Sequence, residues 1–325
     1  MNRKIQTALM IVIIAALSVP PLKAYMTSKL LSNTSVVSQI KWGSGAFPIP
    51  WRLNSTQGTN VTGSVSQEDV FKNSFSAWQG LATANITLAQ GTSTTAKPGY
   101  DGVNLVTTGA TFAEYAAAAP GFETVLAATV VSAFNVGNAV DQLGRNIDFP
   151  GQILEADMMF NPTFTFSTAA TTPATAYDLQ TAATHEVGHF LGLDHSTLAS
   201  ATMFWTASKG QASGRVLSVD DITGLSSIYP NAAFQQRGSL TGTVRTSANV
   251  AVYGAIVTAV NSDGQPVASA ITDTSGRYAI SGLVAGTYTI YAEPLDRPIQ
   301  ATNVSTLGRI FPGATVNINF TTRYR

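Results

Sequence analysis

The sequence predicts an α+β domain followed by a smaller β-sandwich, and three observations support this prediction. The chain has 325 residues, which is enough for roughly two domains. Up to about residue 230, short apolar runs alternate with amphipathic segments of helical spacing. Beyond that point only short alternating segments remain, separated by turns that contain Gly and Asp. We place the linker between the two domains at a polar segment, residues 231–237.

The first predicted domain covers residues 40–230. A helix is expected after Ser66, because Phe71, Phe75 and Trp78 recur at positions i, i+4 and i+7 and so form one strongly apolar face. Such a face should pack on a sheet. Short apolar runs supply the candidate strands of that sheet, at residues 49–53, 86–88, 103–107, 126–134 and 153–160.

The second predicted domain covers residues 238–325. Its candidate strands are residues 240–244, 255–260, 267–272, 278–280, 288–292 and 315–320. Turn signals such as Asn261–Gly264 and Asp273–Gly276 separate these strands, and no helix of useful length is expected between them. Regular short strands with such turns indicate a β-sandwich. This part of the chain contains no His, no Cys and no cluster of residues that suggests catalysis.

The composition excludes several classes of function. Eighteen Lys and Arg balance eighteen Asp and Glu, so the chain lacks the basic excess of a nucleic-acid binder, and we expect no nucleic-acid partner. The absence of cysteine excludes disulfides, thiolate nucleophiles and zinc fingers. Because the chain has three histidines, any chemistry that needs imidazole must use His185, His189 or His195.

The first 24 residues have the pattern of a secretory signal peptide. Arg3 and Lys4 precede an apolar run, Ala8–Leu17, and a small residue follows at Ala24. The alternative is an uncleaved membrane anchor, but a spanning helix needs about 20 apolar residues and this run is much shorter. We expect cleavage near Ala24, a short N-terminal segment at residues 25–39, export from the cell, and no stable membrane span after cleavage.

Candidate catalytic residues are concentrated at residues 185–195. His185 and His189 are four residues apart on an expected helix, so both imidazoles project from one side of it. Gly192 can adopt a positive φ and reverse the chain, which brings His195 to the same point. Three neutral imidazoles bind a zinc ion and leave its fourth position for water. The pattern therefore predicts one catalytic Zn²⁺ with these three histidines as its ligands.

Glu186 follows His185 on the same helix and is the candidate general base. It would take a proton from the zinc-activated water that attacks a peptide carbonyl, and deliver that proton to the leaving amine. A lone His-Glu-x-x-His also occurs by chance on surface helices. Here the third histidine and the intervening glycine have the required spacing, which disfavours the alternative of three unrelated histidines. A Ser-His-Asp triad would have to share a histidine with the metal.

The segment from His185 to His195 resembles the zinc-binding motif of the metzincins, zinc endopeptidases with the pattern H-E-x-x-H-x-x-G-x-x-H and a downstream Met-turn. Met203, eight residues after His195, is similar to the methionine that forms an apolar floor beneath the zinc in this family. Ser196 after the last histidine resembles the matrixin subgroup. The resemblance covers about residues 40–230 and implies a metzincin catalytic domain with a twisted five-stranded mixed sheet and three helices.

The resemblance also implies where a substrate would bind. Leu126 and Ala127 begin the segment that corresponds to the matrixin edge strand above the active-site helix, and an extended peptide can add to such an edge. Phe204 and Trp205 would wall an apolar pocket for the residue that follows the cleaved bond. We therefore expect a protein or peptide substrate, and we expect the protein to be a monomer.

The chain departs from vertebrate matrixins in two respects. It has no further histidines for their second, structural zinc, and no cysteine with which a propeptide could block the catalytic zinc. Calcium binding is a separate expectation. Five side chains could contribute to a Ca²⁺ site, or could simply be solvated or cap turns: Asp101, Asp141, Asp148, Asp157 and Asn161.

Residues 238–325 resemble the carboxypeptidase regulatory-like, transthyretin-like domain, through segments such as Gly242–Val244, Gly254–Val257 and Gly286–Tyr288. The resemblance implies an immunoglobulin-like β-sandwich. Attachment to a substrate or a surface and a stabilising spacer role both stay open, since a fold does not reveal a function.

The motif and the resemblance together predict a secreted zinc metalloendopeptidase. One alternative is a surface binding or adhesion protein in which the zinc site is structural, although a closed structural site would need a fourth protein ligand. A second alternative is a peptidase that acts only on its own chain or on one dedicated partner.

Overall fold

A computed structural model describes residues 11–12, 27–34, 36–296, 298–304, 306–307 and 313–324. The predicted signal peptide, residues 1–24, lies outside the described residues except for β1 (Ile11–Val12), which pairs antiparallel with β9 (Ala127–Ala133). In the described part of the chain, no helix has both the length and the apolar character needed to cross a membrane.

The expected mixed sheet is present in the first domain, and the α+β fold class is confirmed. Its main strands run in the order β9, β12 (Gln152–Phe160), β8 (Leu105–Thr107), β5 (Ile49–Leu53) and β7 (Leu88–Gln90). The pairs among β12, β8, β5 and β7 are parallel, and β9 is antiparallel to β12. Two-residue strands extend the described sheet, because β1 pairs with β9 and β4 (Lys41–Trp42) pairs with β12.

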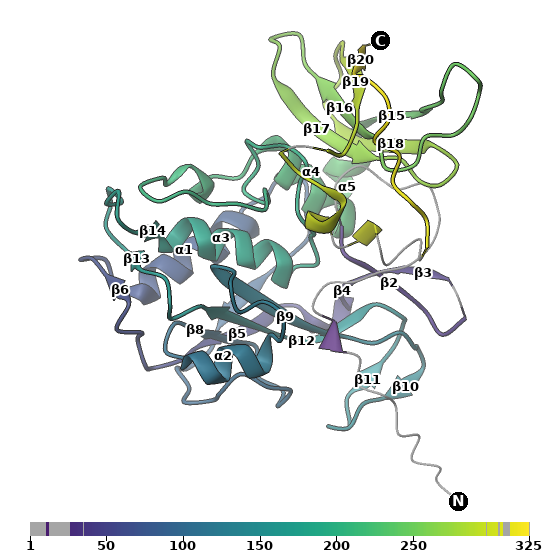
Figure 1. Ribbon diagram of the computed structural model, residues 1–325. Helices are drawn as coiled ribbons and strands as arrows, with labels where there is room; N and C mark the ends of the chain where they lie inside the picture. Colours follow the sequence, from purple (N-terminus) through teal and green to yellow (C-terminus); the bar gives the residue numbers. More distant parts are fainter. Residues whose placement is uncertain are drawn as a thin grey trace, which may run out of the picture.

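Helices cover both faces of this sheet. In Figure 1, α1 (Gln67–Gln79) and α3 (Leu179–Phe190) lie side by side on one face, and α2 (Phe112–Ala118) lies on the other. The alternation of side chains along β12 explains the two layers. Met158 and Phe160 are buried in the cluster that includes α1 and α3, whereas Met159 is buried with Tyr115 of α2. A further helix, α4 (Val219–Ile228), follows α3, so the described residues of this domain carry one helix more than the three that the resemblance implies.

The helix α1 begins and packs as its sequence predicts. The Ser66 side chain accepts a hydrogen bond from Asp69 N at the N-terminus, which satisfies one free backbone donor. Phe75 stacks on Trp51 of β5 with ring centroids 4.3 Å apart. Trp78 is fully buried, and its indole nitrogen donates to the Thr184 carbonyl of α3 at 2.8 Å. The apolar face of α1 therefore fixes α3 over the sheet.

Short elements complete the first domain and the N-terminal segment before it. They are β2 (Lys29–Leu31), β3 (Val37–Gln39), β6 (Val61–Thr62), β10 (Ala139–Val140), β11 (Asn146–Ile147), β13 (Phe166–Ser167), β14 (Tyr177–Asp178), and the 3-10 turns η1 (Ser44–Ala46) and η2 (Ser213–Arg215). The predicted linker contains one further helical turn, α5 (Ala232–Gln235), which Asn231 caps.

The second domain is the expected β-sandwich. One described sheet pairs β15 (Gly238–Thr243) with β18 (Arg277–Leu283). The other has the order β17 (Pro266–Ile271), β16 (Ile256–Val260), β19 (Thr289–Glu293) and β20 (Arg323–Tyr324). The expected strand at residues 315–320 is wrong, because this segment is irregular and Asn317 N donates to the Tyr253 carbonyl instead of to a strand ladder.

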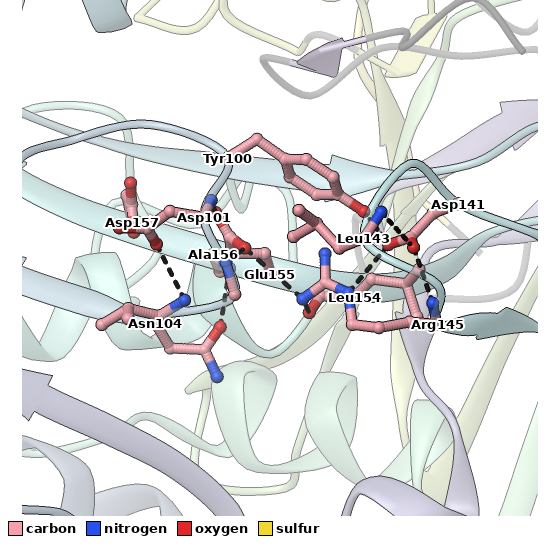
Figure 2. A network of polar contacts seen from close by, with 12 residues as sticks. Tyr100, Asp101, Asn104, Asp141, Leu143, Arg145, Leu154, Glu155, Ala156 and Asp157 are labelled. Carbon is pink, nitrogen blue, oxygen red and sulfur yellow. Dashed lines mark hydrogen bonds and ion pairs between the residues drawn. The ribbon is translucent and has the colours of Figure 1, made fainter. Parts of the chain in front are cut away.

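An ion-pair network occupies the region where calcium was expected. Figure 2 shows the Arg145 side chain between Asp141 and Glu155 of β12. Arg145 Nε donates to Asp141 at 2.8 Å, its Nη1 lies 3.4 Å from Glu155, and the guanidinium lies 4.7 Å from the centre of the Tyr100 ring. Burial acts against the charge of Asp141, but hydrogen bonds from Tyr100 and Arg145 hold the pKa of Asp141 below its ordinary value.

Protein donors also satisfy Asp101, Asp157 and Asn161, and Asp101 accepts from Val103 N at 2.9 Å. Asp157 accepts hydrogen bonds from Gly99 N and Leu105 N, at 2.8 and 3.0 Å, and the Asn161 side chain accepts from Thr163. The described residues contain no group of three or more acidic or histidine side chains spaced for a metal other than the three histidines. The structure therefore gives the calcium expectation no support, and a guanidinium provides the positive charge instead.

Replacing Arg145 by methionine should destabilise the protein by about 3 kcal/mol, because two buried carboxylates would lose their cation. Urea unfolding measures this loss. The matched control is Lys72→Met, which removes an exposed ion pair with Glu68 on α1 and should change the free energy of unfolding little. Equal effects of the two substitutions would contradict a structural role for the Arg145 network.

The two domains share a buried polar contact between α4 and β17. Asp220 Oδ1 accepts from Ser269 N at 2.9 Å, and Asp220 Oδ2 accepts from the Ser196 hydroxyl at 2.6 Å. Asp220 is buried, and burial raises its pKa to about 7 against the effect of the Ser196 hydrogen bond. Because this folded-state pKa is raised, the folded chain binds a proton more tightly than the unfolded chain does. The contribution of Asp220 to stability should therefore fall as pH rises from about 4 to 7.

The substitution Asp220→Asn should remove this pH dependence, since an amide keeps the acceptor for Ser269 without the charge. We compare the free energy of unfolding of the variant with that of the unmodified protein at pH 5 and at pH 8. The difference should shift in favour of the variant by about 2 kcal/mol between the two pH values. Urea unfolding at the two pH values measures the difference. A difference between the two proteins that is the same at both pH values would contradict the raised pKa.

Candidate metal centre

The helix α3 carries the candidate centre and is fixed at its N-terminus. Asp178 caps the helix by accepting from Thr181 N at 2.7 Å, and it forms an ion pair with Arg215. Leu179, Val187 and other apolar residues of α3 are fully buried. The part of α3 that carries the first two histidines is therefore held against α1 and the sheet.

The structure brings His185, His189 and His195 together. Ligand atoms of the three side chains lie within 4.8 Å of one another, and the ring centroids are 4.7 to 5.2 Å apart. Gly192 has a φ of +94°, so the chain reversal expected at this glycine is present. A Cβ at this position would overlap the Ile40 carbonyl oxygen, so both the conformation and the space require glycine.

Backbone carbonyls orient all three imidazoles. The Nδ1 atoms of His185, His189 and His195 lie 2.8, 2.9 and 2.8 Å from the carbonyl oxygens of Thr202, Leu193 and Asn303, in that order. A carbonyl can only accept, so each Nδ1 must carry the hydrogen, and in a neutral ring the opposite Nε2 then keeps a free lone pair. This second set of contacts is the usual way in which proteins fix the tautomer of a metal-binding histidine.

The protonation states also fit a metal. Burial lowers the pKa of His185 well below its ordinary value, and burial together with the neighbouring His195 lowers the pKa of His189 to about 3. Neutral imidazoles are the form that binds metal ions. Among the described residues this group has three members and no fourth protein ligand. Three imidazoles that each offer one nitrogen to a common position fit a tetrahedral Zn²⁺ that keeps one position open.

Glu186 lies in the same cavity and is held by a residue of β9. The Thr129 hydroxyl donates to Glu186 Oε2 at 2.7 Å and lies 3.1 Å from the Glu186 carbonyl oxygen. Burial raises the pKa of Glu186 to about 7, and the Thr129 hydrogen bond opposes that rise. The sequence reasoning missed Thr129. Every second side chain of β9 points toward α3, and Thr129 is one of these. This alternation is the one signal that could have identified it.

Met203, the candidate Met-turn residue, lies against α3. The residue is buried, and its sulfur packs against Gly188, where a Cβ would overlap it. Asp221 of α4 holds this turn, because its carboxylate accepts from Thr202 N and Met203 N at 2.8 and 2.9 Å. Asp221 also forms a capping box with Ser218 at the start of α4.

A cavity of about 360 Å³ opens over the three histidines. All four side chains that the resemblance assigned to substrate binding line it: Leu126, Ala127, Phe204 and Trp205. The β9 edge is paired with β1 at residues 131 and 132, which leaves residues 127–130 without a partner on that side in the described part of the chain. Thr302 and Asn303, which the sequence reasoning did not identify, also line the cavity.

Known proteins resemble both halves of this chain. Residues 134–230 match the family described as Matrixin, and residues 239–323 match the carboxypeptidase regulatory-like domain. Metalloendoproteinase 4-MMP of Arabidopsis thaliana is 43% identical over 54 residues, which is 17% of this chain and 16% of that protein. Metalloendoproteinase 1-MMP of the same plant is 44% identical over 57 residues, which is 17% of this chain and 15% of that protein.

The fold, the three histidines and these matches define a metzincin-type domain joined to a β-sandwich. The chain carries a matrixin domain followed by a carboxypeptidase regulatory-like domain, as the two sequence resemblances predicted. The matched segment spans about one sixth of the length of the two plant relatives.

Proposed function

We propose that this protein is a secreted zinc-dependent endopeptidase, with His185, His189 and His195 as metal ligands and Glu186 as general base. The observation that carries the proposal is the convergence of three imidazoles beside a buried carboxylate, in a cavity that the candidate substrate-binding residues line. When bound, zinc would polarise the substrate carbonyl and lower the pKa of a water molecule at its open position. Secretion rests on the N-terminal sequence pattern alone.

Glu186 would move the proton in this reaction. Its Oε2 accepts from the Thr129 hydroxyl, so Oε1 is the oxygen that takes the proton from the attacking water. Glu186 then delivers the proton to the leaving amine. Thr129 is a positioning residue, because its hydroxyl lies within hydrogen-bond distance of both the Glu186 carboxylate and the Glu186 carbonyl oxygen.

The edge of β9 would bind the substrate. A peptide in extended conformation can pair with residues 127–130, whose outer edge faces the cavity. Leu126, Phe204 and the half-exposed Trp205 give the cavity an apolar lining, so we propose that an apolar side chain of the substrate occupies it. We also propose that the protein acts as a monomer.

The rival function is surface binding or adhesion around a structural zinc. A closed structural site has four protein ligands, whereas the histidine group found among the described residues has three. The open position therefore favours catalysis. A peptidase limited to its own chain or to one partner would share the same centre, and general substrates such as casein separate that alternative from a broad endopeptidase.

The substitution Glu186→Gln should abolish cleavage without removing the metal. Residues 25–325 and the variant should each bind about one zinc per chain, while casein cleavage falls by about 100-fold or more, because the amide cannot accept the proton. Metal analysis and a peptide-library assay provide the two measurements. Glu68→Gln on the exposed face of α1 is the matched control and should cleave normally. Equal cleavage by the Glu186 variant would remove its assignment, and an active metal-free protein would remove the zinc mechanism.

The substitution Thr129→Val should lower kcat by about 10-fold with little change in KM, because Glu186 would lose a hydrogen bond that orients it. Steady-state kinetics on a fluorogenic peptide measure both constants. Thr129→Ser keeps the hydroxyl and should restore most of the activity. Failure of the serine variant to restore kcat would show that Thr129 acts through packing.

A further inference from the structure

The third histidine differs from the other two in where its hydrogen-bond acceptor comes from. Thr202 and Leu193, which accept from His185 and His189, belong to the matrixin domain. Asn303, whose carbonyl lies 2.8 Å from His195 Nδ1, belongs to the C-terminal domain and is 108 residues away in sequence. The orientation of His195 therefore depends on a contact between the domains.

A second interaction fixes the same contact. The Asp194 carboxylate accepts from His195 N at 2.8 Å through Oδ1, while its Oδ2 accepts from both Thr306 N, at 2.9 Å, and the Thr306 hydroxyl. Asp194 and Thr306 are both buried. Asp194 thus links the backbone of the third histidine directly to the C-terminal segment.

The position of this segment is set by the core of its own domain. Ile299, Val304 and Leu307 are fully buried in one apolar cluster with Tyr253, whose hydroxyl donates to the Leu307 carbonyl at 3.1 Å. Between them lies the 3-10 turn η3 (Ala301–Asn303), which carries the carbonyl that faces His195. In Figure 1, the yellow segment after β19 descends from the C-terminal sheets toward the matrixin domain.

The matrixin domain contacts the same cluster from the other side. Phe204, which directly follows Met203, packs against this apolar cluster and also lines the cavity. Thr302 and Asn303 line the cavity together with the three histidines. The C-terminal domain therefore forms part of the cavity wall and supports the chain on both sides of the histidine centre.

We propose that the carboxypeptidase regulatory-like domain completes the metal centre, with Asn303 and Thr306 as positioning residues for His195. The Asn303 carbonyl selects the His195 tautomer that presents Nε2, and Thr306 holds Asp194 and so the His195 backbone. The inference rests on the proposed role of His195 as a metal ligand. It gives the second domain a specific task that neither a spacer nor a surface attachment module would need.

The test compares three variants with the unmodified protein, and all four proteins consist of residues 25–325. Thr306→Val removes the hydroxyl that Asp194 accepts from, and Thr306→Ser restores it. Thr272→Val is the matched control, because Thr272 is an equally buried threonine of the same domain whose hydroxyl bonds to Val252 and Ala255, away from Asp194. Zinc affinity is measured by competition with a chromophoric chelator, and thermal unfolding is followed by circular dichroism.

Thr306→Val should raise the zinc dissociation constant by about 10-fold or more, as expected when an outer contact of a metal ligand is lost. Thr306→Ser and Thr272→Val should bind zinc as the unmodified protein does. NMR of the imidazole Nδ1–H groups gives a readout that is independent of activity. Because the chain has three histidines, few such signals are expected. In Thr306→Val the His195 signal should exchange faster with water, while those of His185 and His189 are unchanged.

Two outcomes would overturn the inference. In one, Thr306→Val binds zinc within twofold of the unmodified protein and keeps the His195 signal. In the other, Thr272→Val weakens zinc binding as much as Thr306→Val does, which would indicate a general loss of domain stability. If Thr306→Val does not fold, Thr306→Ala is measured against the same two criteria. If the unmodified protein binds no zinc, the proposed function fails instead, so the two failures are distinguishable.

Discussion

The structure depends on one constraint, which is that three imidazoles must stay neutral and point one nitrogen each at a common position. Burial keeps His185 and His189 uncharged, and a carbonyl at each Nδ1 directs the opposite nitrogen inward. The positive φ of Gly192 is the backbone feature that allows the third ring to approach the first two. Without that reversal, the helix would carry His195 away from the centre.

The surroundings of the centre serve this constraint through rigid packing. Stacked and buried aromatic side chains of α1 fix α3 on the sheet, and the Met203 turn supports α3 at Gly188. The alternation of β9 then turns Thr129 toward α3 and its neighbours toward α2. A single strand thus supplies both the residue that orients Glu186 and an edge along the cavity.

Buried charges are compensated by the protein itself in the regions away from the centre. Arg145 neutralises Asp141 and Glu155, and backbone amides satisfy Asp157. Across the domain boundary, Ser269 and Thr306 donate to buried aspartates of the matrixin domain. Leaving such groups unpaired is costly, so these contacts favour one fixed arrangement of the two domains.

The sequence by itself determined the features that depend on neighbours along the chain. These include the helical spacing of His185 and His189, the reversal at Gly192, the cap at Ser66 and the change from mixed to all-β structure near residue 230. Local periodicity and backbone preference act over a few residues, so they can be seen in the order of residues alone. The irregular course of residues 315–320 shows the limit of this reasoning, because an apolar, alternating segment still needs a neighbouring strand to pair with.

Only the tertiary structure decided the contacts between distant segments. Thr129 meets Glu186 across 57 positions, and the Asn303 carbonyl meets His195 across 108. Arg145 takes the place in which a cation from solution was expected. Such pairs follow from strand register and from the docking of whole domains. Register and docking place a backbone carbonyl or a hydroxyl without regard to its residue type. No local sequence pattern therefore predicts these contacts.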